Sequence, residues 1–88
     1  MKIKEGFVLH SVGDENVVVA IGKMTTKFRG MIRLNSTGAF IFRQLEKETD
    51  EKSVIDALIA EYGIDEATAS TAASGFIAQL KDAGVLDI

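Results

Sequence analysis

Hydrophobic and polar positions alternate with a period of two through much of the first third of the chain. The segments 7–12 (FVLHSV) and 16–22 (NVVVAIG) are rich in β-branched residues and flank the polar residues 13–15, which have the length of a hairpin connection. In the segment 28–34, positions suited to a core alternate with basic or flexible side chains. The pattern predicts three antiparallel strands, the third with one face toward a core and one basic, partly solvated face.

The period changes to that of an α-helix after Asn35. Apolar residues then recur at helical spacing in the segments 36–46, 51–62 and 66–82. Each segment is preceded by, or begins with, an Asn, Ser or Asp whose side-chain oxygen can cap a helix. Gly63 can end the second helix in the left-handed conformation. We therefore predict three helices.

The order of these elements predicts one α+β domain spanning residues 1–88. A three-stranded meander is too small to be stable alone, so its apolar face must pack against the helices. The glycine-containing turn at 62–66, together with the sheet, favours a winged helix-turn-helix-like fold, with a three-stranded antiparallel sheet followed by a three-helix bundle. The apolar residues 85–88 are expected to fold back on the helices.

The composition offers few groups for catalysis. The chain has no Cys and a single His, His10, so it lacks thiol nucleophiles, disulfides and a cysteine metal site. No serine lies in a nucleophile-elbow sequence, and no glycine fingerprint for a nucleotide cofactor is present. We therefore expect a protein that is not an enzyme, with no catalytic residues, no metal and no cofactor.

The distribution of charge and of apolar runs narrows the class of partner. Residues 1–34 have a net charge of +3, and residues 35–88 have a net charge of -6. The apolar run near the N-terminus is too short for a signal peptide, and no segment approaches the ~20 apolar residues of a membrane span. We therefore expect a cytoplasmic location without membrane contact. The basic residues 1–34 either form an ordinary solvated surface, which is the commoner use of surface charge, or face an acidic partner.

The fold and the charge pattern leave two classes of function open. A helix-turn-helix DNA-binding regulator is the first alternative, but Lys81 is the one basic residue of the helix 66–82, which would be repelled by a duplex. No nucleic acid is therefore expected as a partner. A structural or dimerisation domain is the second alternative, because Val8, Val18 and Ala20 could make the second face of the sheet apolar enough to pair two copies in a homodimer.

The third predicted helix is rich in small side chains between residues 67 and 75. About half of these positions are expected to pack closely in the core, because a helix shows only one face to any neighbour. The low profile of the others could leave a groove beside the third strand. An extended peptide could enter this groove and add itself as a further strand to the open edge of the sheet.

The order of motifs resembles the PqqD family. A strand ending in Leu34-Asn35 is followed by the helix opening STGAFIF (36–42), by EYGID (61–65) at the end of an acidic helix, and by GVLD (84–87) after the third helix. The resemblance extends from about residue 7 to residue 87, and its most specific part is the Leu-Asn and small-residue helix opening. The family includes the peptide chaperone of pyrroloquinoline quinone synthesis and the recognition elements of enzymes that modify ribosomally made peptides.

The resemblance implies a non-catalytic binding module, or chaperone, for the leader segment of a ribosomally synthesised precursor peptide. Such a module presents the peptide to a modifying enzyme, in related systems often of the radical SAM or cyclising type. The residues that match the family's peptide-binding cleft lie on the third strand and the third helix: Phe28, Arg29, Gly30, Met31, Ile32, Arg33, Ala69, Ala72, Ala73 and Phe76. In this interpretation residues 30–33 offer backbone hydrogen bonds, Met31 and Phe76 offer apolar contact, and Arg29 and Arg33 attract acidic leader residues.

Overall fold

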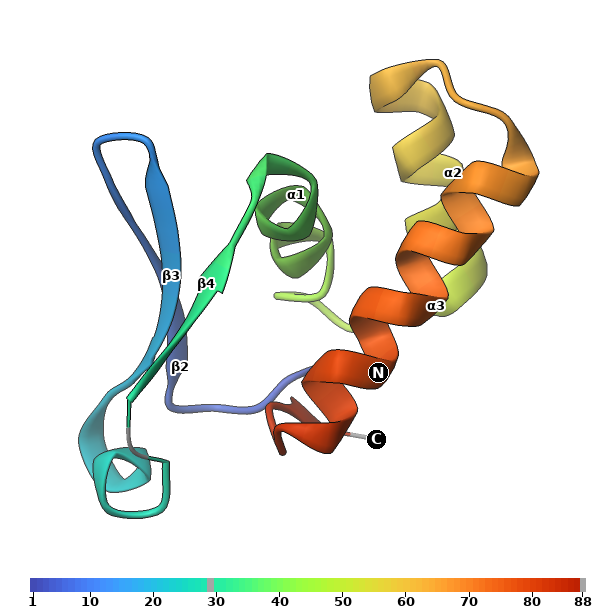
Figure 1. Cartoon of the computed structure of the whole chain (residues 1–88). Coiled ribbons are helices and arrows are strands. Elements are labelled where there is room, and N and C mark those ends of the chain that lie inside the picture. Colours follow the sequence, from blue (N-terminus) through green and yellow to red (C-terminus); the bar gives the residue numbers. More distant parts are fainter. Residues whose placement is uncertain (29, 88) are drawn as a thin grey trace.

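The computed structural model describes residues 1–28 and 30–87, which form a small sheet, a pairing of the two chain ends and three helices (Figure 1). In chain order the elements are β1 (Lys2–Ile3), β2 (Phe7–Val12), β3 (Glu15–Ala20), η1 (Gly22–Thr26), β4 (Met31–Leu34), α1 (Ser36–Gln44), α2 (Glu51–Tyr62), α3 (Glu66–Asp82) and β5 (Leu86–Asp87). The predicted α+β fold, with a three-stranded antiparallel sheet followed by three helices, is confirmed.

The sheet has the order β2-β3-β4, and both pairings are antiparallel. Val12 pairs with Glu15, so the turn between β2 and β3 contains two residues rather than the three predicted. Gly13 has a φ of 59°, which provides the positive φ that a two-residue hairpin turn requires. The second strand, predicted at 16–22, therefore begins one residue earlier and ends at Ala20, where η1 follows.

The third strand is shorter than predicted, because β4 begins at Met31 and not at residue 28. The backbone N–H of Phe28 donates to the carbonyl of Met24 at 2.9 Å, so it continues the turn of η1. Gly30 has a φ of 99°, which lies outside the β region and which glycine tolerates because it lacks a Cβ. The sheet register with β3 accordingly ends at the Val19–Met31 pair.

The helices begin where the sequence predicts and are held by side-chain caps. Each capping side chain accepts a hydrogen bond from a backbone N–H three residues later: Asn35 from Gly38 at 2.7 Å, Asp50 from Ser53 at 2.8 Å, and Asp65 from Thr68 at 2.7 Å. α2 ends at Gly63, whose φ of 63° is the predicted left-handed stop. α1 ends at Gln44 and not at residue 46.

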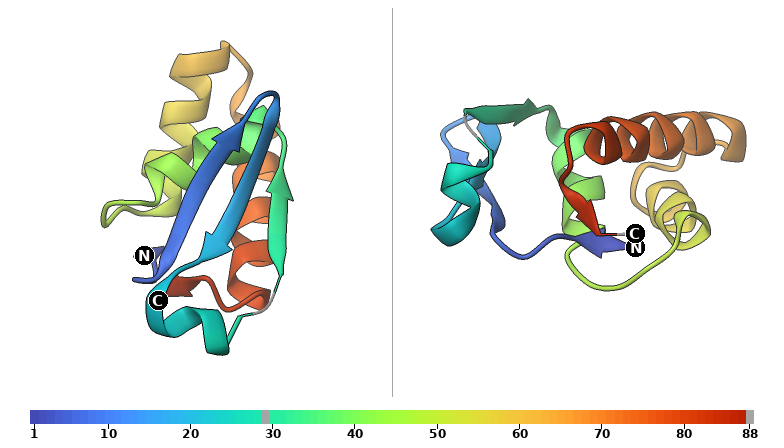
Figure 2. Two further views of the ribbon diagram at one scale, coloured as in Figure 1. Left: turned by 90° about the vertical axis from the view of Figure 1, so that its left-hand side faces the viewer. Right: turned by 90° about the horizontal axis from the view of Figure 1, so that it is seen from below.

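The core lies around α1, which occupies the middle of the molecule between the sheet and the pair α2 and α3 (Figure 2). Phe7, Leu9, Val18 and Ile32 point toward it from the inner face of the sheet. The helices and the C-terminal segment contribute the fully or almost fully buried side chains Ile41, Phe42, Leu45, Val54, Leu58, Ala69, Ala73, Ile77, Leu80, Val85 and Leu86. None of the helices in the described part of the chain is long and apolar enough to span a membrane.

The two ends of the chain pair with each other. Ile3 of β1 lies opposite Leu86 of β5, and both side chains are buried. The backbone N–H of Lys4 donates to the carbonyl of Val85 at 2.8 Å. The C-terminal segment therefore returns to the core as predicted, but it does so by forming a strand pair with the N-terminus that the sequence did not reveal.

Candidate functional site

The outer edge of β4 is the open margin of the sheet. β4 is last in the strand order, and β3 is its one partner among the described residues. In an antiparallel pair, alternate residues direct their N–H and C=O groups toward the partner, so the other residues of β4 direct theirs outward. The C-terminal strand β5 pairs with β1 rather than with this edge. β4 therefore offers backbone groups to which a further strand can bind.

α3 provides a wall next to this edge. With roughly 100° between successive residues, α3 presents two neighbouring faces. One face is buried in the core and consists of Ala69, Ala73, Ile77 and Leu80. The other, about a quarter turn away, carries the half-buried side chains of Ala72 and Phe76 and the exposed side chain of Gln79.

A hollow of about 220 Å³ lies between this second face of α3 and the start of α1, directly after β4. It is lined by Asn35, Thr37, Gly38, Ile41, Ala72, Phe76 and Gln79. A Cβ on Gly38 would lie 3.1 Å from Cε1 of Phe76, so the absence of a side chain at Gly38 lets the phenyl ring approach α1 closely. A second hollow, of about 460 Å³, shares Ala72 and extends toward the N-terminus of α3 along Ala67, Thr68 and Thr71. The two hollows run along one side of α3.

Comparison with known proteins identifies the family of this fold. The family model described as coenzyme PQQ synthesis protein D (PqqD) matches residues 8–86. The chain belongs to the PqqD family. It is also similar to the solved structure described as "TbiB1 in Complex with the TbiA(beta) Leader Peptide", with 25% sequence identity, a TM-score of 0.78, and coverage of 99% of this chain and 95% of that chain. A search of curated proteins gave no match.

The family resemblance inferred from the sequence is thus confirmed over residues 8–86 of the chain. Neither comparison supports the alternative of a DNA-binding regulator.

The structure distributes the predicted strand residues between different surfaces. Met31 and Arg33 are exposed and lie on the side of β4 that faces away from the helices, whereas Ile32 is half-buried and packs against the core. Gly30 is exposed and precedes the strand. Phe28 is half-buried, and its ring packs edge-to-face on Phe7 with a centroid distance of 5.2 Å, so Phe28 supports the core rather than the edge. Arg29 lies outside the described residues.

The predicted helix residues also separate into two groups. Ala72 and Phe76 line the hollow, but Ala69 and Ala73 are 0% exposed and lie in the core. Their small size is explained by close packing inside the domain, and in this conformation their side chains are not accessible to a ligand. Sequence reasoning missed Gly38 and Gln79, although the spacing of 72, 76 and 79 on one helical face could have indicated the latter.

The carboxylates whose pKa values are perturbed lie at the starts of α2 and α3 and, for Glu48, beside the N-terminal ammonium of Met1, and none of them lines the hollows on α3. Hydrogen bonds from the side chain and backbone of Thr68 lower the pKa of Asp65, and those from Ser53 lower the pKa of Asp50. A hydrogen bond from the N-terminal ammonium lowers the pKa of Glu48. Among residues 1–28 and 30–87, no group of three or more His, Asp or Glu side chains could hold a metal ion.

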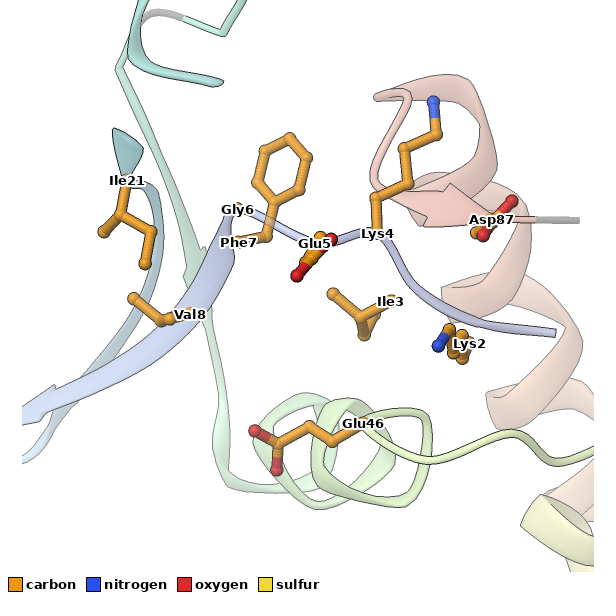
Figure 3. A pocket seen from close by; sticks show the side chains of 10 residues that line it. All are labelled: Lys2, Ile3, Lys4, Glu5, Gly6, Phe7, Val8, Ile21, Glu46 and Asp87. Carbon is orange, nitrogen blue, oxygen red and sulfur yellow. The ribbon is translucent and has the colours of Figure 1, made fainter. Parts of the chain in front are cut away.

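A wider hollow of about 550 Å³ lies at the other end of the domain, where the link between β1 and β2 crosses from the helices to the sheet (Figure 3). The apolar side chains of Ile3 and Phe7 lie among the ammonium groups of Lys2 and Lys4 and several carboxylates, including that of Glu46. Charges of both signs surround this space, so it favours neither an anionic nor a cationic ligand. The hollows on α3 beside β4 are the better candidate site.

Proposed function

We propose that this PqqD-family protein is a non-catalytic recognition module for the leader segment of a ribosomally synthesised precursor peptide. The peptide adds as a fourth strand to the outer edge of β4 and lies along α3. The observation that carries this proposal is the open edge of β4 beside the hollow at Ala72 and Phe76. The similar structure TbiB1, which is described in complex with a leader peptide, supports the same class of ligand.

Backbone hydrogen bonds would provide sequence-independent affinity in this mode. A strand added to an open edge satisfies outward N–H and C=O groups of β4, while alternate side chains of the added strand enter pockets beside it. The hollow of about 220 Å³ has room for one aliphatic or aromatic side chain. Phe76 and Ile41 provide apolar contact in this hollow, and Asn35, Thr37 and Gln79 provide polar groups around it.

Charge would add selectivity. Arg33 is exposed on the strand that the peptide joins, and Lys23 and Lys27 are exposed just before that strand. Acidic residues in the peptide would be attracted to these side chains, although exposed ion pairs are screened by salt and contribute ~0.2–1 kcal/mol each. We therefore expect a leader with an apolar residue for the hollow and acidic residues close to it.

The chemistry of modification would belong to a partner enzyme, of the radical SAM or cyclising type. None of the polar or charged residues in the described part of the chain is buried, so no acid, base or nucleophile there lies in the desolvated environment that shifts catalytic pKa values. The role of this protein is then to hold the leader segment in an extended form while the following segment of the precursor reaches the enzyme.

Alternate N-methylation of the peptide tests strand addition directly. The probe is the leader peptide of a precursor encoded beside this gene, and binding is followed by amide shifts and calorimetry. Each peptide variant carries one N-methyl group, which removes one N–H donor. In a strand added to β4, every second N–H would bond to β4, so N-methylation at these positions should weaken binding at least about tenfold. Methylation at the intervening positions, whose N–H groups point to solvent, should have a much smaller effect. Shifts are expected at residues 31–34 and on the face of α3 that carries Ala72 and Phe76.

Two results would contradict the proposal. Equal effects of N-methylation at all positions would show that the peptide does not bind as a strand. Shifts confined to the hollow at Ile3 and Glu46 would place the ligand at the opposite end of the domain.

A further inference from the structure

The face of the sheet that points away from the helices is apolar and uncovered. The strand register places one row of aliphatic side chains, Val8, Val19 and Met31, across all three strands on this face. Val12 and Val17 lie on the same face. We call the side chains of Val8, Val12, Val17, Val19 and Met31 the outer face.

The outer face does not contribute to the core. The core and the residues packed against it include Leu9, Val18 and Ile32 from the opposite side of the same strands, but none of the five residues of the outer face. Val12 and Met31, at the ends of β2 and β4, are 61% and 57% exposed, and the valines between them, Val8, Val17 and Val19, are half-buried. Figure 2 views the sheet from this side in its left panel, with the three helices behind it.

The residues that form the apolar outer face differ in part from those predicted. Val8 belongs to the outer face, as the sequence suggested, but Val18 is fully buried and Ala20 lies opposite Phe7 on the inner side. Val17 and Val19 take their place.

We propose that the outer face binds a second copy of this chain by packing sheet against sheet. Two such faces pack with their strands within about 30° of each other and with the side chains of the two sheets interdigitated. The ionisable groups that the register places on this face are His10, Glu15 and Arg33, at its edges or beside the apolar row. The row of Val8, Val19 and Met31 contains no ionisable group, so two copies can pack these rows together without burying a charge.

The area of the outer face determines how stable the dimer is. The five aliphatic side chains expose roughly 300 Å², which is within the size of the largest apolar patches on monomeric proteins and is often functional. A standard interface buries ~800 Å² on each partner, so the apolar part supplies less than half of that area. We therefore expect a reversible dimer that forms at micromolar to millimolar concentrations rather than a permanent one.

Sedimentation velocity on the full chain, from about 10 µM to about 1 mM, tests this inference. The wild type should show a sedimentation coefficient that rises with concentration toward that of a dimer. Val17→Glu should raise the dimer Kd at least about tenfold, because each interface would then bury two carboxylates. In the monomer the new carboxylate would lie between His10 and Arg33 on the neighbouring strands, an arrangement that a sheet accommodates well.

Ala60→Glu is the matched control, because Ala60 is exposed on α2, away from the sheet, and the substitution adds the same charge. It should leave self-association unchanged. Val19→Thr provides a second variant with almost the same shape and less apolar surface, and it should raise the Kd in the same direction. Circular dichroism and thermal unfolding establish that each variant is folded.

A wild-type chain that stays monomeric up to about 1 mM would overturn the inference and would leave the outer face for a different partner. It would also be overturned if the folded Val17→Glu variant associated as strongly as the wild type, because the dimer would then use another surface. Amide shifts that depend on concentration should map to the outer face, and shifts that map to α2 and α3 instead would contradict the proposal.

Discussion

Three alanines on α3 allow the orientation of this helix to be tested by one substitution, Ala to Leu. Ala73 is 0% exposed, Ala72 is half-buried at the hollow, and Ala78 is exposed on the side of α3 away from both. Ala73→Leu adds an isopropyl group where there is no free space, and such overpacking costs about 1–3 kcal/mol. For a domain of this size the midpoint of thermal unfolding should fall by about 5–20 °C.

The other two substitutions should have different consequences. Ala72→Leu places the same group in the hollow of about 220 Å³, so we expect a change in stability of less than ~1 kcal/mol and a loss of peptide affinity of at least about tenfold. Ala78→Leu should change neither stability nor affinity appreciably, because its side chain would remain in solvent.

The assays are urea unfolding for stability and calorimetric titration with the leader peptide for affinity. The decisive comparison is between neighbouring positions that carry the same substitution. If Ala73→Leu were as stable as the wild type while Ala72→Leu unfolded readily, Ala72 would lie in the core and Ala73 at the hollow, which is the reverse of the orientation described for α3. If Ala72→Leu bound the peptide normally, the hollow would not be part of the peptide site.

Further predictions concern the ends of the helices. Hydrogen bonds lower the pKa values of Asp50 and Asp65 in the folded state, so their stabilising effect is present above the unfolded pKa of about 4 and is lost as the pH falls through the folded values. Urea midpoints should therefore fall between about pH 5 and pH 2, and less steeply in the double variant Asp50→Asn, Asp65→Asn, which keeps the caps without the charge. Gly63→Ala should destabilise by about 1–2 kcal/mol because of its φ of 63°, whereas Gly75→Ala, inside α3 with open space around a Cβ, should stabilise by about 0.5–1 kcal/mol. A destabilising Gly75→Ala or a neutral Gly63→Ala in urea unfolding would contradict this account.

Local signals in the sequence were sufficient for most of the secondary structure. The caps at Asn35, Asp50 and Asp65 depend on a hydrogen bond to a residue three positions later, so they can be recognised from a few neighbouring letters. The left-handed stop at Gly63 is equally local. For this reason the predicted bounds of α2 and α3 agree with the structure.

Features that depend on contacts distant in sequence were missed. The pairing of β1 with β5 joins Ile3 to Leu86 and leaves no signal in either two-residue strand. The alternating pattern at 28–34 begins three residues before β4 does. A period-two pattern cannot show that the N–H of Phe28 is bonded to the carbonyl of Met24 and therefore belongs to the preceding turn. The sequence did not show which alanines of α3 are buried, because alanine suits a tight core and a shallow groove equally well, and Ala69 and Ala73 lie in the core. Only the packing of α3 in the fold separates the two uses.

β4 would use its backbone edge for the peptide and its outward side chains for the second copy, and Arg33 on the outer face would lie at the border of the two. The backbone groups of a strand lie in the plane of its sheet, and its side chains stand roughly perpendicular to that plane. A peptide on the edge of β4 would therefore leave Met31 on the outer face uncovered. It would also extend the sheet by one strand and so widen the surface available to a second copy. Because coupling between two binding events is reciprocal, a peptide that strengthens the dimer must itself bind more tightly to the dimer than to the monomer.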